Sequence, residues 1–325
     1  MGKARAIVKR RKAVRNIKKI TRTMQMVSTA KFQKSLKRTL GTKPYTLKVR
    51  ELVGELAASV TNVEHPLLRK PGGATATNKI MVVVITSNRG LCGAYNSNVL
   101  KTATKFIRQQ EAAGKTVELY AVGKKGAAFF NFQKRPIAAR QDRLAEVPSY
   151  ELIDEALQPM ISRFAQGELD GIYFVSMNFV STGVQRPEVS TILPLAGLSE
   201  TMENMARQVA EKEAQAAAGV MDAKRRGDDV KVAAIAGGKK ADYEFSPDAA
   251  SLLNELLPMT VKSTIYQALL DSMTSEHVAR MVAMKSATDN ADKMGKALAL
   301  EYNRARQSQI TTELSEIMGG VESMK

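Results

Sequence analysis

The chain has 325 residues, 44% of them hydrophobic, which excludes global disorder and is enough for one large or two medium domains. A single cysteine excludes an internal disulfide, and two distant histidines, His65 and His277, argue against a zinc site. The formal net charge of +17 lies in residues 1–50, which hold 17 Lys and Arg and no acid, whereas the rest of the chain holds 32 of each sign. A charge confined in this way indicates that this segment meets an acidic partner.

Residues 1–63 predict a long helix. Apolar residues recur there at spacings of three and four, which is typical of a seam that packs on a partner helix: Ile17, Ile20, Met24, Val27. Gly41 and Pro44 should kink or loosen this helix. The opposite face is basic, and neighbouring like charges penalise an isolated helix, so a compensating partner is required.

In residues 79–198 the apolar residues no longer recur at helical spacing throughout. Three short apolar runs, at 80–86, 117–122 and 172–177, predict buried strands, and helical stretches lie between them. Alternating strands and helices predict a Rossmann-like α/β domain with a parallel-rich sheet. The longest strongly apolar run, at 80–85, is far shorter than the roughly 20 residues that a transmembrane helix needs.

Residues 246–325 predict a second long helix, which Pro258 should kink or restart. About 70 helical residues would extend roughly 100 Å, too far for a globular domain. The two terminal helices are therefore expected to pair as a long antiparallel coiled coil. An apolar seam continues along this second helix: Val261, Ile265, Leu269, Met273, Met281, Met294, Leu298, Tyr302, Leu314, Ile317.

Residues 201–242 differ in character from their surroundings. They are rich in Ala, Glu and Met and then densely charged, with no aromatic residue, so we interpret them as an insertion.

No group of residues predicts a catalytic site. The glycine-containing turns at 90–93 and 123–126 follow strands, where phosphates often bind, but neither matches a dinucleotide or P-loop motif, so we predict no cofactor site. Cys92 has no neighbouring base to activate it, which favours a structural thiol. Glu276 and Arg280, four residues apart, are the usual pattern of a surface pair on a helix.

Two polar groups on the C-terminal helix each have two interpretations. Residues 288–290 (Thr-Asp-Asn) are either solvated or fix the helix register, as buried polar residues do in coiled coils. Near the end of the chain, a denser group is either a solvated face or a docking surface: Arg304, Arg306, Gln307, Thr311, Glu313.

Three stretches resemble one family, the gamma subunit of F-type ATP synthases. They are 17–31 (IKKITRTMQMVSTAK), 88–93 (NRGLCG) and 276–316, which includes EHVARMVAM and ATDNA. The resemblance covers nearly the whole chain in order, except about 201–242. Asn88 stands where the family more often has Asp, and Val321 where it usually has Ala.

The resemblance implies a rotor without an active site, metal or cofactor. The terminal helices would turn inside a hexamer of alternating alpha and beta subunits, and the α/β domain would lie at the foot, near the epsilon subunit and the membrane ring of c subunits. Arg22 and Met24 would face acidic loops of beta. Other contacts carried over by position are Arg306, Gln307, Thr311 and Glu313 to the hexamer, and Tyr243 and Glu244 to the c ring.

The resemblance also leads to expectations about the location of the protein in the cell and about the role of the insertion. Because the similarity begins within the first twenty residues, we expect no presequence and a peripheral position on the cytoplasmic face of a bacterial inner membrane. Photosynthetic relatives carry a regulatory segment with a cysteine pair where the insertion stands. Residues 201–242 contain no Cys, so we expect a redox-independent structural or braking element.

Two other classes of protein remain open on the residues alone. A nucleic-acid-binding protein could use the basic N-terminal helix on phosphates, but that leaves the long C-terminal helix unexplained. An enzyme could use the α/β domain, which lacks a nucleophile–base pair and a phosphate loop.

Overall fold

The computed structural model describes residues 2–59, 65–69, 76–146, 148–195 and 249–322. The predicted insertion at 201–242, together with Tyr243 and Glu244, lies outside these residues.

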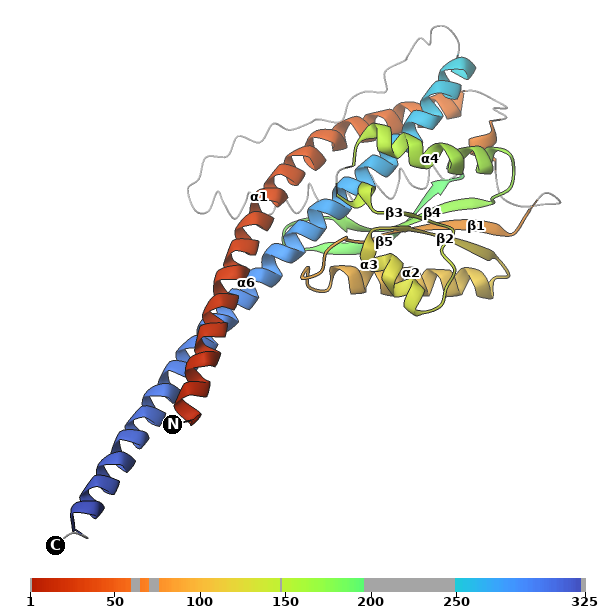
Figure 1. Ribbon diagram of the computed structural model, residues 1–325. Helices are drawn as coiled ribbons and strands as arrows, with labels where there is room; N and C mark the ends of the chain where they lie inside the picture. Colours follow the sequence, from red (N-terminus) through yellow and green to blue (C-terminus); the bar gives the residue numbers. More distant parts are fainter. Residues whose placement is uncertain (1, 60–64, 70–75, 147, 196–248, 323–325) are drawn as a thin grey trace, which may run out of the picture.

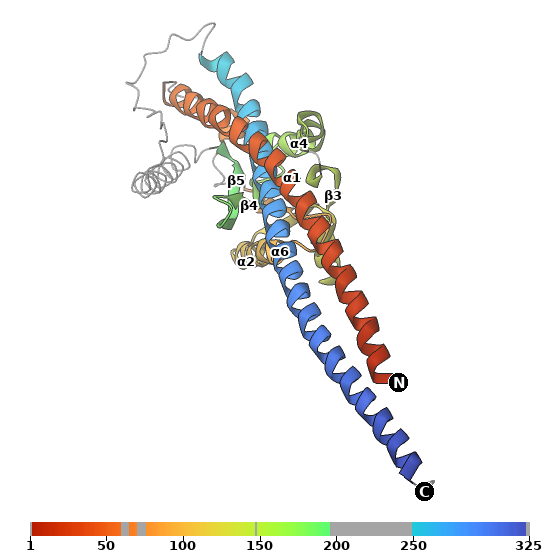
Figure 2. The ribbon, with the colours of Figure 1, turned by 90° about the vertical axis from the view of Figure 1, so that its left-hand side faces the viewer.

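Two long helices from the ends of the chain lie side by side. Helix α1 spans Gly2–Ser59 and helix α6 spans Ala249–Glu322, and they run antiparallel for most of the length of α1 (Figures 1 and 2). At 1.5 Å per residue, the 74 residues of α6 extend about 110 Å. The predicted coiled coil of the two terminal helices is confirmed.

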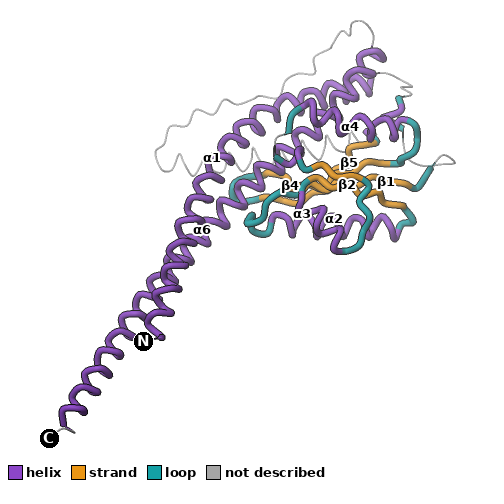
Figure 3. The backbone as a smooth tube through the Cα atoms, in the orientation of Figure 1, coloured by secondary structure: helices purple, strands orange, loops and turns teal. Residues whose placement is uncertain are grey.

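A five-stranded sheet forms the rest of the fold, with the strand order β3-β2-β1-β4-β5 (Figure 3). Strands β1 to β4 are parallel and β5 runs antiparallel to β4. Their bounds are Lys79–Ile85 for β1, Thr116–Val122 for β2, Ala139–Gln141 for β3, Gly171–Phe179 for β4 and Gln185–Leu193 for β5. The three strands predicted from apolar runs are β1, β2 and β4, and the parallel-rich α/β domain is confirmed.

Helices cover both faces of the sheet (Figure 1). Helices α2 (Tyr95–Ala112) and α3 (Lys124–Phe132) pack on one face, and α4 (Tyr150–Ala165) packs with α6 on the other. Short 3-10 turns stand at Pro66–Leu68 and Arg143–Ala145. Since β1 is central, alternate side chains enter each layer, and the coiled coil is joined to the domain through the core that α4 and α6 share.

Neither proline divides a long helix. Pro44 lies inside α1, which curves over its second half, and Pro258 lies ten residues into α6, which continues without a break (Figure 1). The expectation that Pro258 restarts the helix is wrong. A proline removes one backbone hydrogen bond, and packing along the rest of such a long helix offsets that local loss.

Candidate functional site: the paired helices and their junction with the sheet

The seam between α1 and α6 contains buried hydroxyl groups. Thr288 Oγ1 donates a hydrogen bond to Thr21 Oγ1 at 2.8 Å. Further along, the hydroxyls of Ser35 and Thr39 lie 2.5 and 2.9 Å from Thr274 Oγ1. All five side chains are at most 9% exposed. These contacts join particular residues of the two helices and so favour one antiparallel register. Of the three polar residues at 288–290, Thr288 is buried in the seam, whereas Asp289 and Asn290 are exposed to solvent.

The buried positions of α1 recur every seven residues over its first half: Ile7, Val14, Thr21, Ser28, Ser35. A strict seven-residue repeat is the pattern of a left-handed coiled coil. Three of these five residues are Ser or Thr, so a search for apolar periodicity alone misses the repeat. The spacing of small residues, rather than their hydrophobicity, is the signal that could have found it.

The apolar seam predicted for α1 is therefore wrong. Ile17, Ile20 and Val27 are 51%, 59% and 51% exposed, and Met24 is only partly buried. The heptad that faces α6 takes the hydroxyl residues, which turns these three β-branched side chains outward. The exposed surface of α1 thus combines apolar and basic side chains.

The exposed surface of α1 is also strongly basic. Seven cations between residues 5 and 22 are exposed: Arg5, Lys9, Arg10, Lys12, Arg15, Lys19, Arg22. Among the described residues, Lys18 is the one cation of this stretch with an ion pair, to Asp292 of α6. The pairing with α6 therefore leaves most of this positive charge available to a partner.

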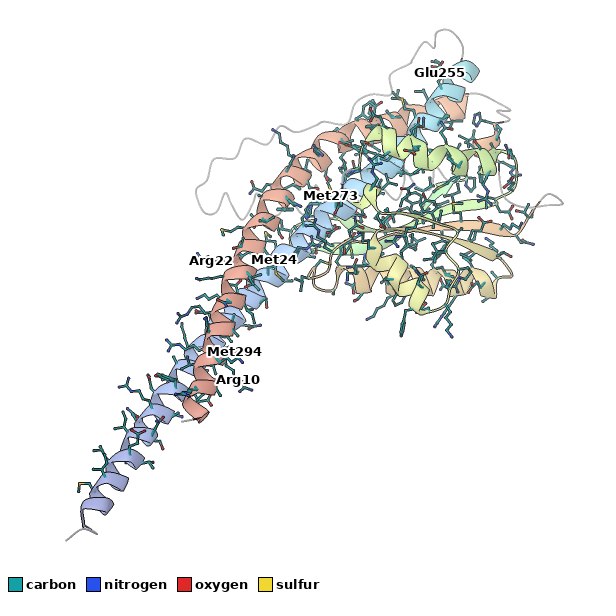
Figure 4. All side chains as sticks on the ribbon, viewed as in Figure 1. Arg10, Arg22, Met24, Glu255, Met273 and Met294 are labelled. Carbon is teal, nitrogen blue, oxygen red and sulfur yellow. The ribbon has the colours of Figure 1, made fainter. Side chains whose placement is uncertain are left out.

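The predicted contact residues fall into two separate groups. Arg22 is exposed and Met24, two residues further on, is partly buried, both near the middle of the paired helices (Figure 4). Arg306, Gln307, Thr311 and Glu313 are all exposed on α6. Since Thr21 pairs with Thr288, the second group begins about 18 residues, or about 27 Å, further along the coiled coil. The structure does not bring the two groups together.

The last part of α6 has no helix beside it in the described chain, because α6 extends well beyond the start of α1 (Figures 1 and 2). Four apolar side chains at helical spacing are exposed there by 44% to 71%: Ile310, Leu314, Ile317, Met318. Leu314 and Ile317 were expected in a seam with α1. That expectation is wrong, because both residues lie on the part of α6 that extends past the first residues of α1. An exposed apolar stripe of this kind is typical of a protein contact.

A buried ion pair joins α6 to the sheet domain. Arg280 lies 2.7 Å from Glu276, and both side chains are 10% exposed. Arg280 also donates hydrogen bonds to the backbone oxygens of Arg89 and Gly90, at 3.1 and 3.3 Å. The expectation of a surface pair is wrong, since the turn after β1 covers the pair. Burial raises the pKa of the Glu276 carboxyl, although Arg280 opposes this shift.

Aromatic packing at the same level connects both helices to β4. Phe32 of α1, Val278 of α6 and Phe179 of β4 form a small buried cluster, with the two rings 6.1 Å apart. His277 lies beside this cluster, and burial lowers its pKa to about 4, so it is neutral at pH 7. The helices and the sheet domain therefore share one packed junction.

The glycine-containing turn at 123–126 uses its backbone N–H groups within the fold. The first backbone N–H groups of α3 are already bonded, that of Lys124 to Asn88 Oδ1 at 3.0 Å and that of Gly126 to Thr86 Oγ1 at 2.8 Å. At Gly123, with φ of +93°, an added Cβ would lie 2.2 Å from the Thr86 carbonyl oxygen, so the turn needs glycine for close packing. This turn has a structural role.

Asn88 joins two loops in a way that a carboxylate could not. Its Oδ1 accepts a hydrogen bond from the Lys124 backbone N–H, and its Nδ2 donates one to the Asp142 carbonyl at 2.8 Å. An ionised Asp has no donor. Nearby, the buried Cys92 thiol lies 3.2 Å from Asn96 Nδ2.

Within the described residues, no cluster of three His, Cys, Asp or Glu could hold a metal ion. In the same part of the chain, no helix is both long and apolar enough to cross a membrane.

Comparison with known proteins identifies the family. Residues 3–324 match the family model described as ATP synthase. The ATP synthase gamma chain of Rhodopirellula baltica is 36% identical, and that of Leptospira biflexa is 35% identical, each over 100% of both chains. The chain belongs to the gamma subunit family of F-type ATP synthases. It is a non-catalytic central-stalk subunit, part of the rotor of a membrane-associated complex.

Solved structures support the fold of this gamma-family chain. A chain of the Euglena gracilis mitochondrial ATP synthase is 17% identical, with a TM-score of 0.63, over 99% of this chain and 95% of that one. A chain of the rotor of the same complex has a TM-score of 0.58 at 16% identity, over 95% and 99%. The paired helices and the sheet domain therefore occur together in known rotor structures.

Proposed function

We propose that α1 and α6 form a shaft that turns inside a hexamer of alternating alpha and beta subunits, while the sheet domain joins the shaft to a membrane ring of c subunits. The observation that carries this proposal is the exposed surface of α1 up to residue 50, which is basic, free of acids and interspersed with apolar side chains. Such a surface needs an acidic and partly apolar surrounding. A hexamer that encloses the shaft supplies contacts on every side of it.

Transmission of rotation needs stiffness and a surface that does not lock. Paired helices with a fixed register supply the stiffness. Charges spread along the shaft supply attraction that tolerates many orientations, because Coulomb attraction is long-ranged and non-directional compared with a hydrogen bond. At physiological salt the Debye length is about 8 Å, so each cation acts mainly on the nearest acidic loop. An asymmetric shaft would then force each beta subunit in turn through open, loose and tight nucleotide states.

Arg22 and Met24 are proposed to meet the acidic loops of the beta subunits. Arg22 and the apolar Met26 are four residues apart on α1 and both are exposed, which suits a contact that combines charge attraction with apolar packing.

The exposed end of α6 is proposed to contact the hexamer higher on the shaft. Its apolar stripe would pack against an apolar surface, and polar contacts would surround it through Arg306, Gln307, Thr311 and Glu313. Two of these four already bond within the helix, since Thr311 Oγ1 donates to the Gln307 carbonyl at 3.0 Å and Glu313 accepts from Gln309 Nε2 at 2.8 Å. Arg306 and Gln307 are then the stronger candidates for partner contacts.

The opposite end is proposed to be the foot. Tyr243 and Glu244 would rest on the c ring, with the epsilon subunit beside the sheet domain. In a bacterium, this places the chain on the cytoplasmic face of the inner membrane, coupled to flow of protons or sodium ions. Nucleic acid is not among the proposed partners, because the basic helix is explained by the shaft.

Met24→Lys tests the contact with the beta subunits. A cation added beside acidic loops should tighten the contact during rotation, so ATP hydrolysis should continue while ion pumping per ATP falls at least about twofold. Membrane vesicles that carry the assembled complex allow both rates to be measured. Met259→Lys is the matched control, since Met259 is a methionine of α6 that is 45% exposed and lies far along the coiled coil from Met24. Equal coupling in the Met24 variant and the wild type would contradict the assignment.

Co-purification tests the assembly itself. A stoichiometric complex with alpha and beta subunits is expected. A chain that instead binds DNA, with affinity falling steeply as salt rises, would support the nucleic-acid alternative.

Residues 201–242 are proposed to act as a redox-independent structural or braking element near the foot. Deleting them should raise ATP hydrolysis if they act as a brake. Unchanged rates of hydrolysis and synthesis would exclude braking.

A further inference from the structure

A second basic surface lies on the sheet domain, on the face away from the coiled coil (Figure 1). Residues 95–135, which include α2 and α3, hold eight Lys and Arg and only two acids. Both acids are held by arginines, Glu111 by Arg135 at 2.7 Å and Glu118 by Arg163 at 2.8 Å. The even balance of charge beyond residue 50 therefore conceals a local excess of positive charge.

An open groove of about 730 Å³ runs between α2 and α3 on this face. Its floor is largely apolar and includes Leu100, Ala112 and Phe129, and its rim carries Lys101, Lys105 and Arg108. Lys101 and Lys105 are one turn apart on α2 and both are exposed. An apolar floor below a basic rim matches an amphipathic helix whose polar face is acidic.

Phe132 adds an anchor beside the groove. It is 87% exposed, and it follows Phe129, which lines the groove, by one helical turn of α3. Exposed aromatic rings next to basic groups are frequent centres of binding energy in protein interfaces. Within the described residues its ring lies outside the core, whereas Phe130, two residues earlier, is in the core at 1% exposure.

We propose that the groove between α2 and α3 binds an acidic amphipathic helix of a partner protein. A flat bilayer would touch the basic rim and leave the apolar floor empty, so an anionic membrane fits the surface less well. The partner would sit on the opposite face of the sheet from the shaft, and it would turn with the rotor without obstructing α1 or α6.

The experiment uses photo-cross-linking in the assembled complex. Phe132 is replaced by the photoreactive aromatic residue p-benzoylphenylalanine, and mass spectrometry identifies the attached segment. The expected product is a protein segment with an excess of Asp and Glu and with apolar residues at helical spacing. Lys101→Glu/Lys105→Glu should lower the cross-link yield at least about fivefold, because it reverses the charge of the rim. Lys79→Glu/Arg186→Glu, on the sheet domain but outside the groove, reverses the same number of exposed charges and should leave the yield unchanged.

The other outcomes overturn the proposal. They are cross-links to lipid only, cross-links to a segment without excess acid, no cross-link at all, or equal loss of yield in both double variants. The same photoreactive residue in place of the exposed Met26 of α1 shows that the chemistry works in the complex, and it should reach the hexamer. Failure at position 26 counts against the proposed shaft, whereas failure at position 132 alone counts against the groove.

Discussion

The sheet domain and the paired helices are held together by different kinds of contact. In β1, every residue from Ile80 to Ile85 is apolar and at most 4% exposed. Along the central part of the α1–α6 seam, the buried residues are largely Ser and Thr, joined by hydroxyl contacts such as Thr21 to Thr288. The domain is stabilised mainly by removing apolar surface from water, and the seam by satisfying polar groups in one register.

This difference suits the two roles of a rotor subunit. A close-packed apolar core resists deformation, so the domain can act as a rigid body. Small side chains with hydrogen bonds specify one pairing of two long helices while leaving their larger apolar residues, such as Ile17 and Ile20, for partners. Glu276 and Arg280 join the two regions through the hydrogen bonds of Arg280 to the turn after β1.

Phe130→Ala should give the largest loss of stability, because it removes a ring from the apolar core of the domain. Truncating a buried Phe costs about 3–5 kcal/mol, and Phe130 is 1% exposed. The midpoint of urea unfolding of the full chain measures the effect. Phe132→Ala, two residues away and 87% exposed, should change stability by less than about 0.5 kcal/mol. Similar losses in both variants would show that the core does not dominate the stability of this domain.

Arg280→Ala should come next, since it leaves the buried Glu276 carboxylate without its partner. Breaking such a pair costs about 3 kcal/mol or more, and replacing both charges restores much of it, so Glu276→Gln/Arg280→Met should be closer to the wild type. The same unfolding measurement applies.

The loss in Arg280→Ala should also depend on pH. The pKa of Glu276 is already raised in the folded chain, and loss of the arginine raises it further. The folded state then favours the protonated carboxyl, so stability falls as pH rises from the unfolded pKa through the folded pKa. The deficit should therefore be larger at pH 8 than at pH 5. An equal deficit at both values would place the cost in lost packing rather than in the unpaired charge.

Much of the fold was predictable from the sequence, because β1, β2 and β4 are continuous apolar runs and the terminal helices are long. Strand β5 was missed because its first half is polar and mostly half-exposed, including Arg186 and Glu188, as suits a strand at the edge of a sheet. The junction was missed for another reason. Glu276 and Arg280 have the spacing of a surface pair, and only the folded chain shows that the turn at Arg89 and Gly90 covers them.

Thr274→Val should have the smallest effect and tests the seam directly. It leaves the buried hydroxyls of Ser35 and Thr39 without their shared partner, which should cost about 1–2 kcal/mol. Removing all three hydroxyls in Ser35→Ala/Thr39→Val/Thr274→Val leaves none of this group unsatisfied, so this triple variant should be close to the wild type in its urea midpoint.

Thr312→Val is the matched control for the seam, because Thr312 is exposed on the same helix and bonds only to the Ser308 carbonyl of its own turn, at 2.9 Å. It should change stability by less than about 0.5 kcal/mol. If the triple variant is less stable than Thr274→Val, the hydrogen bonds among these hydroxyls stabilise the paired helices by more than the burial of the hydroxyls costs. A stable triple variant whose ATP hydrolysis is poorly coupled to ion pumping would instead assign the hydroxyls to register, since apolar replacements hold the helices together without specifying which residues meet.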